Sequence, residues 1–215
     1  TIPACLDSIL SQDYQNPEII VVDGGSTDST IEIIRRYPVK VLIENAKDRS
    51  IPHARNVGIN AASGSIIVFI DSDCVAEKNC LSALVKHFDR EEVAGVGGQI
   101  FYCRSLIKKE NPMTVSSIFP PYSPPIAYRK KHLERIGGFD ETLPYGEDWD
   151  LYVRVRLAGY KVIYEPKAIV YHRLRSTKQM VKLMFYRSQS NVLRMYWKHK
   201  DLLLGIKKRS KIVSE

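Results

Sequence analysis

Two carboxylates stand where a predicted strand ends, in positions suited to binding a cation or a nucleotide. Asp71 and Asp73 follow the apolar segment 65–70, with Ser72 between them. In open α/β sheets, ligands bind outside the carboxyl ends of the strands. Mg²⁺ and Mn²⁺ bind to one or two carboxylates together with substrate phosphates. The two acids could therefore share one divalent cation, or one could bind the cation and the other a ribose; a solvated turn is the competing interpretation.

A third carboxylate, Asp23, ends the buried segment 17–22 and precedes the glycine pair that includes Gly25. An acid there can accept a hydrogen bond from a base or a ribose, and the glycines allow close approach. A βα turn with a helix cap explains the same residues. We expect this strand and the strand before Asp71 to belong to one sheet, with their acids facing one crevice.

The helix predicted to begin at His53 presents Arg55, whose guanidinium could bind a diphosphate or stack on a base. An exposed arginine on a surface helix is the alternative. His172 follows an apolar strand; a histidine near an acidic site is a candidate third metal ligand.

The densest acidic cluster is Gly146-Glu147-Asp148-Trp149-Asp150, at the start of another predicted helix. Acids in the first turn of a helix are favoured by its dipole, which is a purely structural explanation. The functional interpretation is a general base at the mouth of a pocket, with the aromatic neighbour lining an acceptor site.

Strands and helices alternate along the first two thirds of the chain, which predicts a mostly parallel, Rossmann-like sheet flanked by helices. Ser29 and Glu32 fit a capping box at a helix start. The chain opens into a helix, so we expect that a first strand of the fold is missing. The expected strands are 17–23, 39–43, 65–71, 93–100, 162–164 and 168–171, and the expected helices are 2–11, 29–37, 53–62, 78–90, 130–136 and 147–158.

Composition bounds the class of protein. The chain has 215 residues, 44% of them hydrophobic and 26% charged, which suits one globular domain with an appendage. Its longest apolar run, 66–70, is far shorter than the roughly 20 residues that span a bilayer. No secretory signal opens the sequence. The four cysteines form no CxxC pair, which indicates reduced thiols and a cytoplasmic location, with two disulfides as the alternative.

The net charge of +8 is concentrated at one end. Residues 173–215 hold twelve Lys or Arg against Asp201 and Glu215, so residues 1–172 carry a net charge of −2. This distribution argues against a nucleic-acid-binding surface. Basic and aromatic residues mixed over 177–204 predict a helical tail lying on an anionic membrane surface. Packing of this tail on the body is the alternative.

Six motifs in this order resemble glycosyltransferase family 2, over residues 1 to about 175. They are Ile19-Ile20-Val21-Val22-Asp23-Gly24-Gly25-Ser26-Thr27-Asp28-Ser29-Thr30, Ala54-Arg55-Asn56-x-Gly58, Asp71-Ser72-Asp73, Gly137-Gly138-Phe139-Asp140-Glu141, Glu147-Asp148, and Gly159-Tyr160 with His172. The resemblance implies the A-type glycosyltransferase fold. It implies a nucleotide-sugar-binding half, 1–103, an acceptor-binding and catalytic half, 104–175, and the basic tail 176–215.

The resemblance also implies roles for these residues in an inverting transfer of a sugar from a nucleoside diphosphate sugar to an acceptor hydroxyl. The acceptor would be a glycan or a lipid-linked sugar, and the cofactor Mn²⁺ or Mg²⁺. The implied donor-binding residues are Asp23, Gly25, Arg55, Asp71 and Ser72; the metal ligands Asp73 and His172; the acceptor-side residues Gly138, Phe139, Asp140, Glu147 and Trp149; and the catalytic base Asp148.

Two other classes of function remain open. A nucleotidyltransferase would use similar strand-end acids, although the glycine- and basic-rich phosphate loop that such enzymes need is not seen. A non-catalytic module would bind nucleotide sugar at a membrane, held there by the basic tail. We expect a cytoplasmic protein, peripheral on the cytoplasmic face of a membrane if the tail binds lipid.

Overall fold

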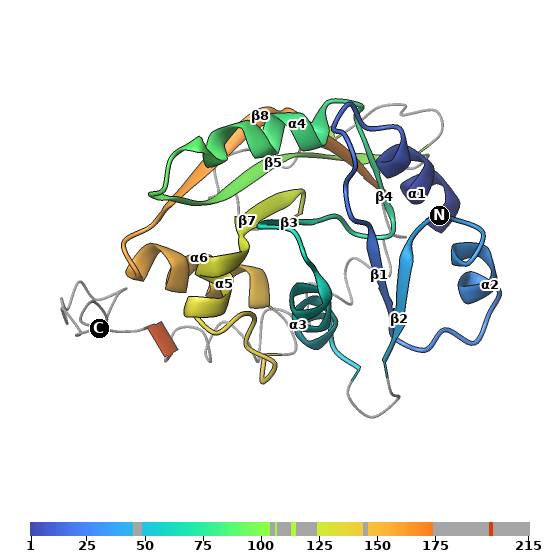
Figure 1. Ribbon diagram of the computed structural model, residues 1–215, viewed down its shortest axis with the longest axis horizontal. Helices are drawn as coiled ribbons and strands as arrows, with labels where there is room; N and C mark the ends of the chain where they lie inside the picture. The colour runs from blue at the N-terminus through green and yellow to red at the C-terminus, as the bar shows by residue number, and fades with distance from the viewer. Residues whose placement is uncertain are drawn as a thin grey trace.

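The computed structural model describes residues 1–44, 49–103, 106, 113–114, 124–143, 146–173 and 198–199 (Figure 1). The helices are α1 (Ile2–Leu10), α2 (Thr30–Ile34), α3 (Ile51–Ala61), α4 (Cys80–Val85), the 3₁₀ helix η1 (Lys86–Asp89), α5 (Lys130–Arg135) and α6 (Glu147–Leu157). The strands are β1 (Ile20–Asp23), β2 (Lys40–Ile43), β3 (Ile66–Phe69), β4 (Cys74–Ala76), β5 (Val93–Cys103), β6 (Met113–Thr114), β7 (Ile126–Arg129) and β8 (Lys161–Arg173). Within these ranges, no helix is both long and apolar enough to cross a bilayer.

The first two strands form a small parallel sheet, with Ile20 opposite Lys40 and Asp23 opposite Ile43. In Figure 1 this pair stands between α2 on one side and α3 on the other. We expected β1 and β3 to lie in one sheet, and this was wrong: in the described part of the chain, β1 pairs with β2, whereas β3 pairs with β7. Asp23 therefore ends a different sheet from the strand that precedes Asp71.

The larger sheet has the order β3-β7-β5-β8-β4, with β6 beside β5. Here the expectation of mostly parallel strands was wrong. The β5–β8 pair is parallel, whereas β7 runs antiparallel to both β3 and β5, and β4 runs antiparallel to β8. The reason is that β7 inserts between β3 and β5 in the reverse direction. It leaves β3, β5 and β8 pointing the same way, so their carboxyl ends still lie toward one edge.

Strand β8 replaces the two short strands expected at 162–164 and 168–171. A shift in register against β5 accommodates the extra residues: Gly97 faces Tyr164, but Gln99 already faces Ile169. At Gly98 the two backbones come so close that a Cβ atom would lie 2.2 Å from the Ala168 carbonyl oxygen. This glycine therefore permits the bulged pairing of the two longest strands.

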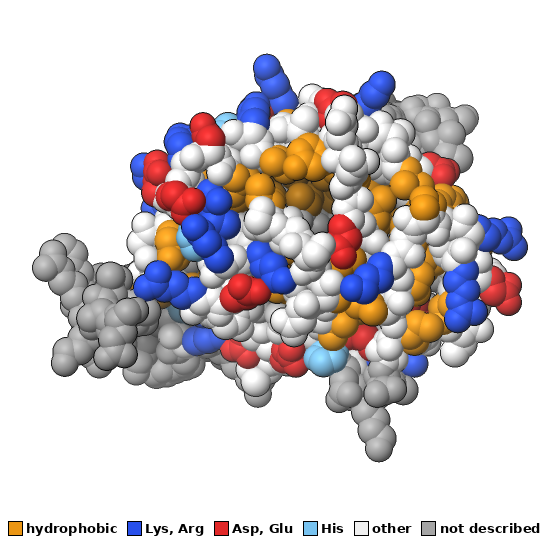
Figure 2. All heavy atoms as spheres, in the orientation of Figure 1, with side chains coloured by type: hydrophobic (Ala, Val, Ile, Leu, Met, Phe, Trp, Pro, Cys, Tyr) orange, Lys and Arg blue, Asp and Glu red, His pale blue; other side chains and the backbone are white. Residues whose placement is uncertain are grey.

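Apolar side chains pack on both faces of the larger sheet. One cluster joins Leu84 and Phe88 to Val96 and Val170, and the other joins Leu133 and Leu151 to Tyr128. Figure 1 shows α4 on one face of the sheet and α5 with α6 on the other. Figure 2 shows a hollowed area with hydrophobic side chains between the levels of β5 and β3, with charged side chains to its left and below it. The layers are therefore those of the predicted α/β class, with helices on both faces.

Most of the expected helices differ by one or two residues at an end, and two differ further. The helix expected at 78–90 consists of α4 and η1. The helix expected to reach Tyr37 ends at Ile34, and Ser29 makes no side-chain capping bond there. Instead, the carboxylate of Asp28 accepts the amide of Thr30 at 3.0 Å. An Asx-type turn has taken the place of the predicted capping box.

Candidate functional site

The acids after β3 and the histidine at the end of β8 are brought together by the β4–β8 ladder. Cys74 at the start of β4 lies opposite His172, which places the turn 71–73 beside the imidazole. The Nε2 atom of His172 lies 3.3 Å from Asp73 Oδ1 and 4.0 Å from Asp71 Oδ2. The predicted grouping of Asp71, Asp73 and His172 is thus present, while Ser72 between the acids is exposed.

This group fits a divalent cation. The ligand atoms of Asp71, Asp73, Cys74 and His172 all lie within 4.8 Å of one another. The Nδ1 atom of His172 lies 2.9 Å from the Arg173 carbonyl oxygen, so this nitrogen donates its proton there. In the neutral imidazole, Nε2 then keeps a lone pair directed at the two acids, the arrangement commonly found in metal-binding histidines.

Cys74 is a member of this group that the sequence analysis missed. Its thiol is buried, and burial followed by the charges of Asp71 and Asp73 raises its pKa far above the usual range. The thiol therefore stays protonated beside the carboxylates. Its position directly after Asp73 was visible in the sequence, but its closeness to His172 depends on strand pairing.

Arg55 joins this group to the acidic start of α6. Its Nη2 atom lies 3.5 Å from Asp71 Oδ1, and Nη1 lies 3.2 Å from Glu147 Oε1 and also bonds to Asp148. The guanidinium carbon lies 5.2 Å from the ring centre of Phe139, which makes a cation–π contact with it. Burial lowers the pKa of Arg55, but the three carboxylates outweigh burial and raise it. The arginine is therefore a fixed charge between strand and helix.

Asp148 lies in a setting that opposes ionisation. Burial raises its pKa; the adjacent Arg55 lowers it, but the nearby charges of Glu147 and Asp71 raise it again, to about 7. A carboxylate with a pKa near neutrality can accept a proton at physiological pH, which is the property required of a general base.

Asp23 is buried and engaged in its own turn. One carboxylate oxygen accepts the amides of Gly25 and Ser26 at 2.8 and 2.6 Å, and the other accepts the Ser26 hydroxyl at 2.7 Å. Gly25 adopts a φ of 78°, which favours glycine. Arg49, a residue not foreseen, donates to the Gly25 carbonyl oxygen at 3.1 Å. These contacts keep the turn after β1 in one shape.

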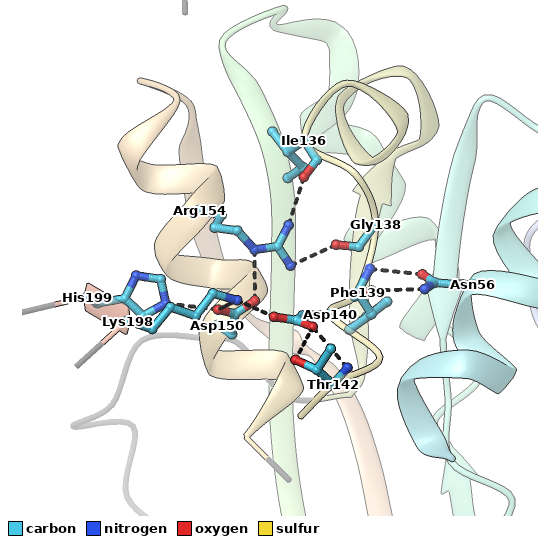
Figure 3. A network of polar contacts seen from close by, with 10 residues as sticks. All are labelled: Asn56, Ile136, Gly138, Phe139, Asp140, Thr142, Asp150, Arg154, Lys198 and His199. Atoms are coloured by element: carbon cyan, nitrogen blue, oxygen red, sulfur yellow. Dashed lines mark hydrogen bonds and ion pairs between the residues drawn. The ribbon is translucent and has the colours of Figure 1, made fainter. Parts of the chain in front are cut away.

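Gly138 and Phe139 are held against α3 by Asn56, another residue without a predicted role. The Phe139 amide donates to Asn56 Oδ1 at 2.8 Å, and the Asn56 side-chain amide donates to the Phe139 carbonyl oxygen at 2.9 Å (Figure 3). A Cβ atom on Gly138 would lie 2.7 Å from Asn56 Oδ1, so close contact requires glycine here. The turn is thereby placed next to Arg55, the neighbour of Asn56 in the chain.

The remaining predicted residues lie around the start of α6. Glu147 is buried against Arg55, and Asp140 contacts Thr142 and Lys198. Trp149 contacts the ring of His199, with 5.7 Å between ring centres. Of the predicted tail 176–215, Lys198 and His199 are described, and both contact the body; the rest lies outside the described residues.

Comparison with known proteins gives a consistent result. The family described as Glycosyl transferase family 2 matches residues 1–143, and a second, Glycosyltransferase like family 2, matches residues 95–196. Glycosyltransferase AglE of Haloferax volcanii is 28% identical, over 86% of this chain and 66% of its own length. The pre-mycofactocin glycosyltransferase of Mycobacterium tuberculosis is 31% identical, over 74% of this chain and 38% of its own.

The chain thus spans less than two thirds of these two relatives. A third relative is matched more completely: the UDP-Glc:alpha-D-GlcNAc-diphosphoundecaprenol beta-1,3-glucosyltransferase WfaP of Escherichia coli is 28% identical, over 99% of this chain and 85% of its own length.

Two solved structures share the fold. Staphylococcus aureus TarS 1–349 in complex with UDP-GlcNAc superposes with a TM-score of 0.69 at 24% identity, over 84% of this chain and 56% of its own. Mannosyltransferase PcManGT from Pyrobaculum calidifontis, in complex with GDP-Man and Mn²⁺, gives 0.64 at 24% identity, over 82% and 54%. The predicted A-type glycosyltransferase fold is confirmed.

Proposed function

Because the chain belongs to glycosyl transferase family 2, we propose that it is an inverting glycosyltransferase that moves a sugar from a nucleoside diphosphate sugar to an acceptor hydroxyl. The observation that carries this proposal is the position of Arg55. It contacts Asp71 in the cation-binding group on one side and Asp148 on the other. One residue therefore links the groups suited to holding a diphosphate with the group suited to taking a proton.

On the donor side, the turn after β1 binds the nucleoside through Asp23 and Gly25, and Asp71 and Ser72 meet the ribose. Asp23 already accepts three hydrogen bonds within its turn. A nucleobase bound there would therefore add a further hydrogen bond to this carboxylate. Two fold relatives support this kind of donor, since their structures contain UDP-GlcNAc and GDP-Man.

Asp73 and His172 would hold the cation, Mn²⁺ or Mg²⁺, and the Mn²⁺ complex of one fold relative supports this choice. A cation bound there supplies a positive charge that stabilises the leaving nucleoside diphosphate. The charges around this position favour a cation, because four carboxylates lie near the single positive charge of Arg55. They are those of Asp71, Asp73, Glu147 and Asp148.

On the acceptor side, Asp148 takes the proton from the acceptor hydroxyl. The acceptor oxygen forms a bond to the anomeric carbon while the bond from that carbon to the diphosphate oxygen breaks. This single displacement inverts the anomeric configuration. Arg55 sets the distance between base and donor, and the turn from Gly138 to Asp140, with Glu147 and Trp149, shapes the acceptor site.

A lipid-linked sugar is the acceptor class that we favour. WfaP acts, by its name, on a sugar linked to diphosphoundecaprenol, and the basic composition of residues 173–215 would suit an anionic membrane surface. The acceptor side of the site, rather than the donor side, would then face the lipid.

Product analysis tests the reaction class. A panel of UDP- and GDP-sugars is incubated with the protein, Mn²⁺ and lipid-linked acceptors. We expect release of nucleoside diphosphate, and NMR spectroscopy of the product should show an inverted anomeric centre. Release of pyrophosphate would instead indicate nucleotidyl transfer. Donor binding without turnover of any pair would indicate a binding module and contradict the proposal.

A further inference from the structure

Asp150 is a fully buried carboxylate that contacts three basic side chains. Its Oδ2 atom accepts from Arg154 Nε at 2.8 Å, and its Oδ1 atom lies 2.6 Å from Lys198 Nζ and 2.8 Å from His199 Nε2 (Figure 3). Asp150 lies on α6 two residues after Asp148, whereas Lys198 and His199 come from far along the chain. A distant segment of the sequence thus reaches the helix that carries the proposed base.

The charges at Asp150 favour its ionised form. Burial raises the pKa of Asp150, but the hydrogen bonds from Lys198 and His199, together with the charge and hydrogen bond of Arg154, outweigh burial, and the net effect lowers it. Removing Lys198 would leave the buried Asp150 carboxylate with fewer partners, and contacts of a buried charge respond strongly to substitution.

Lys198 also bonds to the acceptor-side turn. Its Nζ atom lies 2.5 Å from Asp140 Oδ2, so one ammonium bridges the turn and α6. Arg154, which lies on α6, makes a second connection between this helix and the turn. It donates to the carbonyl oxygens of Ile136 and Gly138 at 2.8 and 2.7 Å. The turn 136–142 is thereby fastened to α6 on this side.

The opposite side of the same turn is fastened to α3. Asn56 exchanges two hydrogen bonds with the backbone of Phe139, and the adjacent Arg55 bonds to Asp148. A closed path of contacts therefore runs from Lys198 through the turn to α3, and back to Asp148 on α6. Loosening Lys198 would free one attachment of the turn while leaving the Asn56 attachment in place.

We propose that Lys198 is a positioning residue, which bridges Asp140 and Asp150 and so fixes the acceptor-side turn relative to Asp148. The inference rests on the proposed function, and it adds a contribution from the C-terminal part of the chain to the acceptor site. Lys198 acts through the two carboxylates and not on the reacting atoms. Its loss should therefore impair use of the acceptor and spare binding of the donor, which depends on the turn after β1 and the acids after β3.

The test compares Lys198→Met with Lys131→Met. Lys131 is a matched control because it also forms a 2.6 Å ion pair, but with Glu91 and from helix α5. We expect Lys198→Met to lower kcat/KM for the acceptor by at least about tenfold, since small misplacements near a reacting group have effects of this size or larger. The Kd for the donor should change by less than about twofold, within the scatter of surface substitutions. Lys198→Arg, which retains the charge, should recover most of the loss.

Hydrogen–deuterium exchange gives a readout that does not depend on turnover. In Lys198→Met we expect faster exchange in the peptides covering 136–142 and 146–150, and unchanged exchange in β1 and β2. Unchanged exchange at 136–142, or equal acceptor kinetics in the two methionine variants, would overturn the inference. Loss of donor affinity in parallel with acceptor use would overturn it too, as would failure of Lys198→Arg to recover activity. A wild-type protein that turns over no donor would refute the proposed function, while the exchange experiment would still decide on Lys198.

Discussion

Asp148 is the residue whose environment predicts the clearest pH dependence. Burial and neighbouring carboxylates raise its pKa to about 7. A general base must be deprotonated to act, so kcat/KM should be at its maximum above this pKa. Below pH 7 it should fall about tenfold per pH unit, because the competent fraction falls in that proportion. A pH profile of kcat/KM for the acceptor measures this directly.

The control for this profile is the donor affinity over the same pH range. It should vary less, because Asp148 is not among the proposed donor ligands. A profile that is flat from pH 5 to 8 would contradict the assignment of Asp148 as the base.

Asp73 is the residue at which dependence on a metal is best tested. In the Asp73→Ala variant, we expect that Mn²⁺ no longer raises the affinity for a nucleoside diphosphate. Isothermal titration calorimetry with and without Mn²⁺ measures this. Asp73 and His172 are the proposed ligand pair, with 3.3 Å between Asp73 Oδ1 and His172 Nε2. Without Asp73, His172 alone would bind the ion weakly. Asp89→Ala is a matched control, because Asp89 is an exposed acid on η1. Equal enhancement by Mn²⁺ in both variants would show that Asp73 is not a ligand.

Residue types and order predicted the strand-end acids and His172, and the structure brings them together. The sequence could not predict the contacts between distant residues that build the rest of the site. Arg55 and Asp148 are 93 positions apart, and Asn56 meets a turn 83 positions away. Such pairings depend on how the layers pack, and no local pattern encodes them. The thiol of Cys74 was missed for the same reason, since the β4–β8 register places it opposite His172.

At the scale of elements, hydrophobic patterns located β1, β2, β3, β5 and β8, but they missed β4, β6 and β7 and did not give the strand directions. An apolar segment such as 126–129 reads the same in either direction, and β7 runs antiparallel between β3 and β5. A glycine, rather than the hydrophobic pattern, marks an irregularity in the strand pairing. Gly98 marks the place where β5 and β8 shift register, which the sequence showed only as one of several glycines in a strand.

Gly98→Ala should therefore weaken the larger sheet. A Cβ atom would lie 2.2 Å from the Ala168 carbonyl oxygen, and backbone atoms on both strands would have to move. We expect a loss of about 1–3 kcal/mol in the free energy of unfolding, typical of overpacking. Differential scanning calorimetry should show a lower Tm, by roughly 2–4 °C for each kcal/mol.

Gly64→Ala provides the comparison, because the nearest atom to its Cβ would be 3.6 Å away, an ordinary contact. Its Tm should stay near that of the wild type. Equal Tm values for the two alanine variants would show that the β5–β8 approach tolerates a side chain.

The whole molecule has an uneven charge distribution, with a slightly acidic body and a basic segment from 173 to 215. Lys198 and His199 contact the body through polar groups, paired with Asp150, whereas the packing alternative places apolar residues of the tail on the body and its charges in solvent. The membrane interpretation for the rest of 176–215 stays a prediction. A test by substitution suits it better than truncation, because truncation would also remove Lys198.

Lys207, Lys208 and Arg209 form a basic group away from Lys198 in the sequence. Replacing all three by Gln should reduce partitioning onto anionic liposomes by up to roughly 100-fold, since each basic residue near such a surface contributes about 1 kcal/mol. Flotation with neutral liposomes is the control and should show little difference. Binding that is insensitive to salt and to the triple substitution would argue against an electrostatic membrane surface.

Joint measurement of turnover and donor affinity in Asp148→Asn tests the proposed function most directly. Asparagine keeps the shape of the side chain but cannot accept the proton, so the two readouts should separate. We expect kcat for release of nucleoside diphosphate to fall on the order of 10²–10⁴-fold, the usual contribution of a positioned base, with the donor Kd nearly unchanged. Wild-type turnover in Asp148→Asn would contradict the assignment and direct attention to Glu147 as the nearest remaining carboxylate on Arg55.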